Sequence, residues 1–458
     1  SVSINNSLPN LAQSFLWGMG KVITWEYPKI WRGLIDLDLN SSFEQITQLV
    51  TEITSQSTEH QIAFRNGKRL VARLTKPNYS VTKTTSLKSE KTYLITGGLG
   101  ALGIKTAQWM ISKGVRHLVL MGRSQPSLDI ISLLSQYQQQ GVNIQVIQGD
   151  VSRLEDVSRV LEMIKNTMPV LAGIIHTAGV LDDGILAEQT WEKFQRVMLP
   201  KVQGTWNLHE LTKNLNLDFF VAFSSLTSVL GSPGQSNYAA ANVFMDTLMQ
   251  YRKSLGLSGL SINWSLWDTI GMSATLTTYQ QKRLTETGIK AITTEQGFNI
   301  LEQLLEKTSG QMGVFSIDWS TFQIQLNSEI NQAFLAEFLA APVEAQKSIL
   351  VKLEEADKDE EFDILLAYLL EQVAKVLKLD SDVKNDDTLN RLGFDSLMAV
   401  ELRNQIIKEL NIQFSVEQIL EGITLSELAQ LILNKMALAQ MTVQKVEVNN
   451  EEIEEIII

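Results

Sequence analysis

The stretch YLITGGLGALGIKTAQWMISKG, residues 93–114, decides the fold. It contains an apolar strand, a glycine-rich turn and a helix in that order, which brings the first turn of the helix close to the end of the strand. Gly98 permits the tight turn, Gly100 allows close backbone approach, and Gly103 lets helix and strand pack closely. A pyrophosphate fits against such a helix N-terminus. The stretch therefore predicts a nucleotide-binding unit.

A glycine triple also occurs in plain structural turns, so its surroundings matter. From Thr92 onward, short apolar stretches alternate with longer helical ones: TYLITGG, HLVLMGR, NIQVIQGD, LAGIIHTAG, DFFVAFSS and GLSINWS. Strands that alternate with helices form a parallel sheet with helices on both faces. We therefore expect an α/β fold with a doubly wound parallel sheet of the Rossmann type.

The pattern changes at several points along the chain, which predicts separate domains. We expect a smaller structural subdomain at 1–90, which contains the hairpin-like HQIAFRNGKRLVARL, and a catalytic, nucleotide-binding subdomain at 91–320. Helical stretches without a strand partner predict an all-α four-helix bundle of about 80 residues. The remaining predicted segments are a linker at 321–357, the bundle itself at 358–437 and an acidic tail at 438–458.

Composition excludes several classes of function. The chain has 458 residues, 44% of them apolar, and a net charge of −12, which disfavours nucleic-acid binding. It has no cysteine, and its four histidines are scattered, so neither a disulfide nor a metal site is expected. No apolar run is long enough to span a membrane and no signal peptide is evident, so we expect a cytoplasmic protein that binds no membrane. Residues 358–458 contain 20 acidic and 9 basic residues, which concentrates the acid in the C-terminal part.

The second predicted strand ends in LVLMGRS, where an NAD-specific fold usually has an acidic residue for the ribose hydroxyls. Arg123 and Ser124 follow instead, and a guanidinium suits the 2′-phosphate of NADPH. The alternative is that Arg123 is only a solvated loop cation. Other predicted cofactor contacts follow the first, third and fourth strands: Thr96, Leu99, Asp150, Val151, Ala178 and Gly179.

A second stretch, FSSLTSVLGSPGQSNYAAAN (223–242), suggests the chemistry. Ser225 and Tyr238 stand thirteen positions apart, as in short-chain dehydrogenases, but Asn242 occupies the place of the lysine expected four residues after the tyrosine. Reduction of a ketone needs an acid to protonate the oxygen and a cation to strengthen that acid. Lys201, on the helix after the fourth predicted strand, is the candidate cation for Tyr238.

The combination of Lys201, Ser225, Tyr238 and Asn242 resembles the ketoreductase domain of modular polyketide synthases, in which lysine and asparagine have exchanged sequence positions. The resemblance implies NADPH-dependent reduction of a β-ketoacyl thioester. LWGMGKVITWEYPKIWRGLIDLD looks like the subdomain that precedes the catalytic one, and SINWSLWDTIGM, ending at Met272, resembles the lid segment. The family's first subdomain begins with a strand that is missing before Ser1, so we expect either a piece cut from a longer polypeptide or a subdomain that is interrupted there.

Ser396, in GFDSL, is presented at the start of a predicted helix, where a phosphodiester is favourable. The motif resembles the modification site of acyl carrier proteins and implies 4′-phosphopantetheine, attached by a phosphopantetheinyl transferase. The alternative is that the Asp-Ser pair only caps a helix. The acidic excess fits a carrier that docks onto basic surfaces. Upstream ketosynthase and acyltransferase domains are the other partners implied.

HTAGVLDDGIL contains Leu181, Asp182 and Asp183, and Leu230 stands eight residues before Tyr238. In the family that these residues resemble, Leu-Asp-Asp accompanies a D-configured hydroxyl, and a tryptophan eight residues before the tyrosine accompanies the opposite class. Both positions therefore predict a D-configured product. The alternative is that the two aspartates only begin a helix or lie in a solvated loop.

Three other interpretations compete with a polyketide ketoreductase. A free-standing dehydrogenase would not need the carrier bundle, and the terminal reductase of a peptide synthetase keeps a lysine four residues after the tyrosine. A silent reductase-like fold that only positions the carrier is the third. The tail, with EEIEEI, is either a docking element for a downstream synthase or a disordered linker end.

Overall fold

The computed structural model describes residues 10–449, except for a set of segments in which placement is not described. Those segments are 39–42, 56, 78–86, 269–286, 306–309, 326–331, 340–348, 350–352, 354–356, 359, 378–383, 386, 390, 411, 413 and 421. The end of the predicted lid, including Met272, and the last nine residues of the tail therefore lie outside the described residues. The chain forms two compact units, 1–340 and 341–458.

The larger unit is built on a seven-stranded sheet whose neighbouring strands all run parallel. Its order is β11-β9-β8-β7-β4-β5-β6, so the chain leaves β4 in one direction and returns on the other side of it with β7. The strands are β4 (Thr92–Thr96), β5 (His117–Gly122), β6 (Asn143–Gln148), β7 (Leu171–His176), β8 (Phe219–Ser225), β9 (Leu260–Trp264) and β11 (Gln311–Val314). The doubly wound α/β fold is confirmed. The sequence pattern indicated six of these strands and missed β11.

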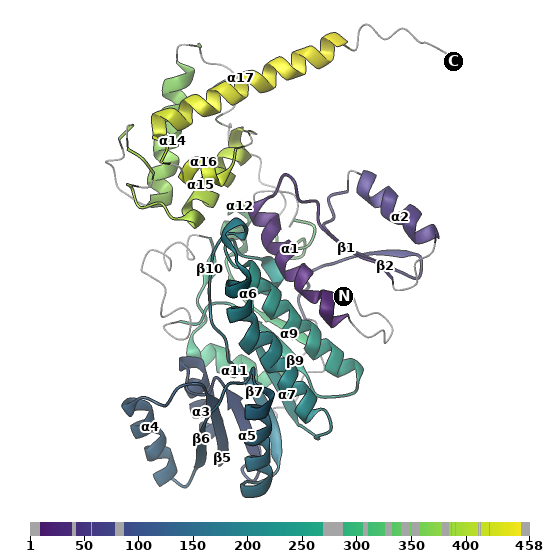
Figure 1. The fold of residues 1–458 in the computed structure, drawn as a ribbon, viewed down its shortest axis with the longest axis vertical. Coiled ribbons are helices and arrows are strands. Elements are labelled where there is room, and N and C mark those ends of the chain that lie inside the picture. The colour runs from purple at the N-terminus through teal and green to yellow at the C-terminus, as the bar shows by residue number, and fades with distance from the viewer. Residues whose placement is uncertain are drawn as a thin grey trace. The chain divides into compact units, whose positions relative to one another are not determined.

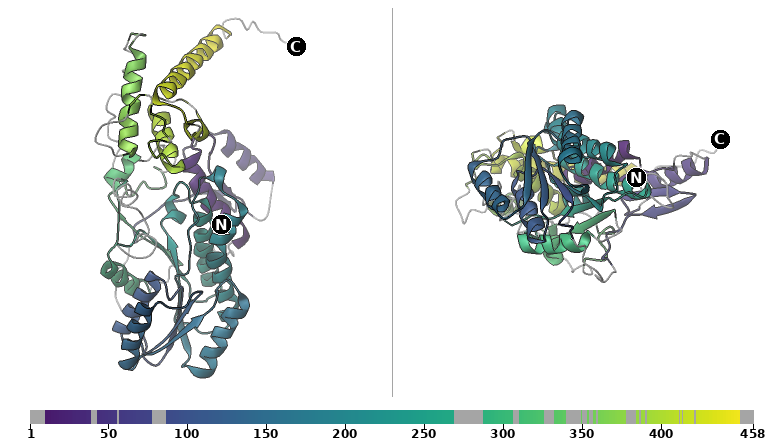
Figure 2. Two further views of the ribbon diagram at one scale, coloured as in Figure 1. Left: turned by 60° about the vertical axis from the view of Figure 1, so that its left-hand side comes forward. Right: turned by 90° about the horizontal axis from the view of Figure 1, so that it is seen from below.

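Helices cover both faces of the sheet (Figures 1 and 2). On one face lie α3 (Ala101–Ser112), α4 (Leu128–Gln139) and α11 (Thr294–Leu304). On the other lie α5 (Leu154–Thr167), α7 (Gly204–Thr212) and α9 (Ser236–Ser254), with α6 (Trp191–Met198) beside α9. Both faces of the sheet are apolar, because parallel strands buried between two layers of helices need apolar side chains on both sides.

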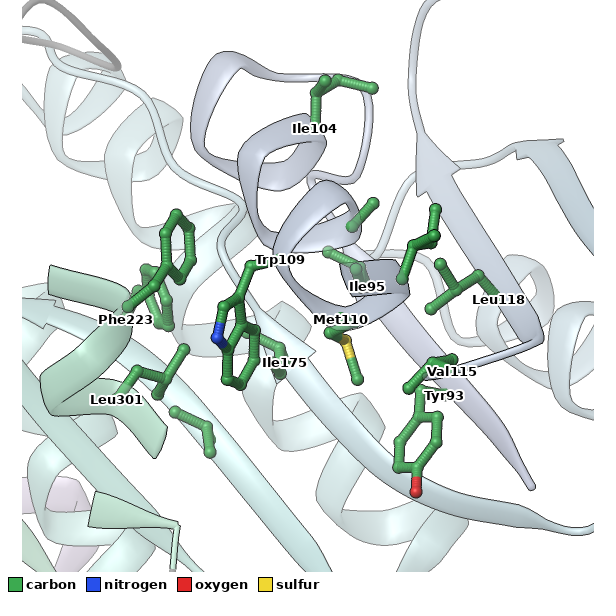
Figure 3. Close-up of a cluster of buried hydrophobic side chains, with 14 of the residues drawn as sticks. Tyr93, Ile95, Ile104, Trp109, Met110, Val115, Leu118, Ile175, Phe223 and Leu301 are labelled. Carbon is green, nitrogen blue, oxygen red and sulfur yellow. The ribbon is translucent and has the colours of Figure 1, made fainter. Parts of the chain in front are cut away.

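Two apolar clusters result, one on each face. Tyr93 and Ile95 of β4 point into the first cluster, and Leu94 between them belongs to the second. Figure 3 shows the first cluster, in which Trp109 and Met110 of α3 lie over the strands. Trp109 stacks on Phe298 of α11 with ring centroids 5.5 Å apart. Each fully buried side chain of this size contributes about 1.5–3 kcal/mol to folding.

The N-terminal subdomain is a small three-stranded sheet with two α-helices and one short 3₁₀-helix in its described residues. β1 (Leu34–Asp36) pairs in parallel with β2 (Gln61–Arg65), which forms a hairpin with β3 (Lys68–Val71). The hairpin turns through Asn66 and Gly67, both with positive φ, as a two-residue turn of this twist requires. The other elements are η1 (Leu11–Gln13), α1 (Ser14–Glu26) and α2 (Phe43–Thr54).

Helix α1 leaves its small sheet and packs along α9 of the catalytic subdomain (Figure 1). Phe15 stacks on Phe244 with ring centroids 5.3 Å apart. Gly18 lies directly against the α9 backbone, because a Cβ there would be 2.5 Å from the Ala239 carbonyl carbon and from the Ala240 nitrogen. The absent side chain at Gly18 therefore sets the distance between the two helices.

Shorter elements complete this unit. α8 (Thr227–Leu230) follows β8, η2 (Leu186–Glu188) follows β7, and β10 (Ile289–Lys290) pairs with β12 (Ser316–Ile317) before α12 (Trp319–Gln325). Leu335, within the predicted linker, is buried against Leu226, Val229 and Phe322. The described residues 332–339 therefore belong to the larger unit.

The second unit is helical in its described residues, as the sequence predicts. Its helices are α14 (Glu361–Leu377), α15 (Ser396–Leu410), α16 (Val416–Leu420) and α17 (Leu425–Asn449). Apolar side chains of all four helices are buried, among them Leu369, Leu402, Ile419 and Ile432. α17 runs past residue 437, the predicted end of the bundle. In the described part of both units, no helix is long and apolar enough to cross a membrane.

We expect the substitution Gly18→Ala to destabilise the larger unit, because its methyl group would collide with the α9 backbone. Overpacking of this kind costs about 1–3 kcal/mol, measurable by urea unfolding. Leu16→Ala on the same helix is the control, since Leu16 is 56% exposed. The control should change stability by less than about 0.5 kcal/mol. Equal effects of the two substitutions would contradict the close helix contact.

Candidate active site

The four predicted catalytic side chains come from three segments at the carboxyl edge of the sheet. Ser225 is the last residue of β8, and Tyr238 and Asn242 lie one helical turn apart on α9. Lys201 lies between α6 and α7, after β7. Ligands of doubly wound folds bind at this edge, at the point where the strand order reverses. The fold thus brings together residues that are up to 41 positions apart.

Lys201 reaches the site through an irregular stretch of helix. Pro200 has no backbone N–H and interrupts the α-helical ladder, and a five-residue π-helical segment, η3 (Leu199–Gln203), connects α6 to α7. Such insertions often redirect a functional side chain. Lys201 is 3% exposed, and its ammonium donates to the Phe223 carbonyl at 3.2 Å. Its Nζ lies 5.1 Å from the centre of the Tyr238 ring.

Tyr238 is buried, and its surroundings determine how readily it loses its proton. Burial raises the pKa of Tyr238 to about 12, while the adjacent side chains of Asn242 and Ser225 oppose that rise. The Asn242 amide donates to the Tyr238 carbonyl at 2.8 Å, which fixes the asparagine on the helix. The Asn242 Oδ1 atom is buried and has no hydrogen-bond partner among the described residues.

Two opposing effects set the pKa of Lys201: its burial and the buried carboxylate of Asp246. Burial lowers the pKa of Lys201 to about 7, and the Asp246 carboxylate acts in the opposite direction. Asp246 follows Asn242 by one turn of α9 and accepts from Ser228 at 2.7 Å and from Asn263 at 2.9 Å. Asn263 also donates to Ser224 at 3.0 Å. The hydrogen bonds of this buried polar cluster therefore hold the end of β8 in place.

His176, at the end of β7, is buried and neutral. Burial and, to a smaller extent, the nearby Lys201 lower the pKa of His176 to about 3. Its Nδ1 is 2.6 Å from the Thr96 hydroxyl. Thr96, a predicted cofactor contact, is itself fully buried, so its hydroxyl serves the pairing of β4 with β7.

The glycine turn after β4 has the form that a dinucleotide needs. Gly97 has a φ of +70°, and a Cβ at Gly103 would lie 2.3 Å from the Gly97 carbonyl oxygen. A Cβ at Gly98 would lie 2.7 Å from the Ile95 carbonyl oxygen, so the turn excludes side chains there. Gly100 is the N-cap of α3, and no side chain caps that helix end. The N-terminus of α3 is thus free of a side-chain cap, and a helix N-terminus of this kind suits a pyrophosphate.

The other predicted cofactor residues lie at the carboxyl ends of neighbouring strands. Arg123 and Ser124 follow β5 and are exposed, and Leu99 of the glycine turn lies beside Gly122. Asp150 follows β6, where its carboxylate accepts from Ser152. Three more predicted contacts follow β6 and β7: Val151, Ala178 and Gly179. They line one edge of the sheet, on both sides of the point where the strand order reverses.

The segment Leu181 to Asp183 lies beside the start of α9. Leu181 packs against the cluster of Val197, Tyr238 and Ala241. Asp182 forms an ion pair with Arg196 at 2.8 Å, and Asp183 accepts from the Gln235 amide at 3.0 Å. Neither aspartate begins an α-helix, and both are held by partners on neighbouring segments.

In the second unit, Ser396 is the first residue of α15. The Asp395 carboxylate accepts a hydrogen bond from the backbone N–H of Met398 at 2.8 Å. Asp395 therefore caps the helix, and Ser396 is not needed as its N-cap.

Comparison with known proteins agrees with this geometry. The family model of the KR domain matches residues 91–269. A ketoreductase domain from the bacillaene assembly line is 31% identical with a TM-score of 0.64, over 69% of this chain and 77% of that one. A structure described as A-type ketoreductases from a modular polyketide synthase is 30% identical with a TM-score of 0.69, over 74% and 71%. The chain belongs to the polyketide synthase ketoreductases.

A carrier domain follows the ketoreductase, since the family model of the phosphopantetheine attachment site matches residues 367–432. A 6-methylsalicylic acid synthase of Arthrobotrys oligospora is 32% identical over 88% of this chain. One component of the phenolphthiocerol/phthiocerol polyketide synthase of Mycobacterium tuberculosis is 32% identical over 75% of it. The chain spans 24% and 16% of the length of these two relatives.

Two residues of this ketoreductase were missed by reasoning from sequence. Asp246 continues the spacing of Tyr238 and Asn242 on α9, and that four-residue repeat of polar groups on a buried helix was a usable signal. Glu26 lies more than 150 residues before the loops that it contacts, and no local pattern indicates its role.

Proposed function

We propose that this ketoreductase uses NADPH to reduce a β-ketoacyl thioester, carried by phosphopantetheine on Ser396, to a D-β-hydroxyacyl thioester. The observation that carries the proposal is the Lys201 ammonium 5.1 Å from the Tyr238 ring. Lys201, which is far from Tyr238 in sequence, takes the place of the lysine that Asn242 replaces. This contact supports an active reductase over a silent fold that only positions the carrier.

In the proposed reaction, Tyr238 protonates the carbonyl oxygen and Ser225 donates a second hydrogen bond to it. Lys201 stabilises the phenolate that remains, because a positive charge near the ring favours the ionised form. Asn242 would accept a hydrogen bond beside Tyr238, since its buried Oδ1 atom has no partner among the described residues. A bound nicotinamide supplies the hydride. The exposed Arg123 at the end of β5 is proposed to hold the 2′-phosphate of NADPH.

The carrier role is proposed for Ser396 because Asp395 already caps α15. A phosphopantetheinyl transferase would modify Ser396, and upstream ketosynthase and acyltransferase domains would build the chain that it carries. The acidic tail is proposed as a docking element for a downstream synthase. The domain boundaries given above remain predictions, apart from residues 332–339, which pack in the larger unit.

The test of the proposed function is reduction of a β-ketoacyl pantetheine thioester by the purified chain, followed as NADPH consumption. We expect turnover and a predominantly D-configured alcohol on chiral chromatography. The expected configuration follows from Leu181 to Asp183 and from Leu230. An L-configured product would refute the interpretation of these residues. No NADPH consumption would favour the silent fold.

We expect the substitution Lys201→Met to lower the rate by about 10²–10⁴-fold, because Tyr238 loses the charge that makes it a stronger acid. The pH profile separates this role from a loss of folding. In the wild type, Lys201 deprotonates as pH rises through its pKa of about 7, so kcat/KM should fall there. In the variant that step should vanish and only the much higher pKa of Tyr238 should remain. A wild-type profile in the variant would contradict the relocated lysine.

We expect the substitution Arg123→Ala to raise the KM for NADPH about 10-fold or more and to leave the KM for NADH nearly unchanged, because only NADPH has the 2′-phosphate. Steady-state kinetics with both nucleotides measure the ratio. Arg116→Ala is the control, since Arg116 precedes β5 at the opposite end of that strand. Equal increases for the two nucleotides would remove the proposed phosphate contact.

We expect the substitution Ser396→Ala to abolish the mass increase produced by a phosphopantetheinyl transferase and to leave reduction of a diffusible thioester nearly unchanged. Intact mass spectrometry and NADPH consumption measure the two outcomes. Ser426→Ala, which changes a serine at the start of α17, is the matched control and should still be modified. Modification of the Ser396→Ala protein would place the attachment site elsewhere.

A further inference from the structure

Glu26, the last residue of α1, places a buried carboxylate beneath two loops of the catalytic subdomain. It is 2% exposed. Its Oε1 accepts from the backbone N–H of Gly234 at 2.8 Å, and its Oε2 accepts from the backbone N–H of Leu186 at 2.7 Å. One side chain of the N-terminal subdomain therefore joins the segment before α9 to the segment after β7.

These two loops are also joined to each other. The Gly184 N–H donates to the Gly234 carbonyl at 2.8 Å, and Gln235 donates to the Asp183 carboxylate at 3.0 Å. Asn237 donates to the Asp182 carbonyl at 2.8 Å. The residue after Asn237 is Tyr238, so the position of this pair of loops is transmitted directly to the start of the catalytic helix.

Two other side chains of α1 form hydrogen bonds with the backbone of α8. Trp25 donates through its indole N–H to the Leu230 carbonyl, and Lys21 donates to the Ser228 carbonyl, both at 2.7 Å. Leu230 stands eight residues before Tyr238, at the position from which the product configuration was predicted. The end of α1 thus contacts α8, the loop before α9 and the loop that contains Leu181.

Within α1 itself, nothing favours a buried glutamate at position 26. A negative charge in the last turn of a helix faces the negative end of the helix dipole and is locally unfavourable. A buried carboxylate also loses hydration that only strong hydrogen bonds replace. Backbone N–H groups that donate to a carboxylate form such bonds. The two loop amides therefore compensate for an otherwise unfavourable charge, and they are held by it in turn.

We propose that Glu26 is a positioning residue that fixes the two loops through which a pantetheine-bound substrate reaches Tyr238, and that it acts on binding and product configuration. The proposal rests on the proposed function above. Leu181, in one of the two loops, packs against the cluster that contains Tyr238, so displacement of that loop changes the wall of the site. A small ketone without a pantetheine arm does not depend on that wall to the same extent.

The test compares two substrates, a β-ketoacyl pantetheine thioester and a small cyclic ketone, in the full chain. In Glu26→Gln, one oxygen becomes an N–H donor that faces an N–H donor. We expect kcat/KM for the thioester to fall about 10-fold or more, mainly through KM, as loss of a hydrogen bond to a charged group implies. We expect the product to lose configurational purity. For the small ketone, kcat/KM should stay within about 2-fold of the wild type.

A second pair of variants removes the same hydrogen bond from the loop side. Leu186 is the first residue of η2, and the residue before it has φ −59° and ψ 157°, which suits a following proline. Leu186→Pro deletes the N–H that reaches Glu26, and Leu186→Ala shortens the side chain but keeps that N–H. We expect Leu186→Pro to reproduce the Glu26→Gln effect, Leu186→Ala to lack it, and the double variant to be no worse than either single one.

Val22→Ala is the control for loss of stability, since Val22 is fully buried on the same helix. It should lower the unfolding midpoint without separating the two substrates. Equal loss of activity on both substrates in Glu26→Gln, or unchanged KM and configuration, would overturn the role of Glu26 and leave the proposed function intact. A wild-type chain that reduces neither substrate would instead refute the proposed function itself.

Discussion

Helix α9 is buried along its sequence from Ser236 to Met249, and the rest of the site depends on that burial. One side of the helix packs on the sheet, and the other side receives α1 at the distance that Gly18 allows. Because the helix is held on both sides, Tyr238, Asn242 and Asp246 keep a fixed position relative to the sheet. A catalytic helix that could slide would lose its relation to Lys201, which comes from a different segment.

The burial that holds α9 also governs the chemistry of the site. Desolvation raises the pKa of Tyr238 and lowers that of Lys201, so both groups shift toward their neutral forms. Asp246 opposes the shift of Lys201 from within the same helix. A buried acid, a buried base and a buried carboxylate thus lie close together, and the carboxylate of Asp246 favours the charged form of Lys201.

The N-terminal subdomain is part of the site. Its own small sheet places β1 to β3 away from the catalytic residues, but α1 crosses to α9 and ends at Glu26 (Figure 1). Through Lys21, Trp25 and Glu26, this helix contacts the backbone of α8 and of both loops around the start of α9. Hydrogen bonds therefore join the first subdomain of the ketoreductase to backbone segments of the second on either side of the start of α9.

Local patterns in the sequence determined much of this protein: six strands of the sheet, the glycine turn, the hairpin at Asn66 and Gly67, and the helical carrier with Ser396 at a helix start. Each depends on neighbours in the chain, whose periodicity and backbone preferences are visible in sequence. The strand β11, the support of Lys201 by Asp246 and the contact of Glu26 with Gly234 and Leu186 were decided only by the tertiary structure. They join segments tens to hundreds of residues apart, and such pairings depend on how the whole chain packs, which no local pattern records.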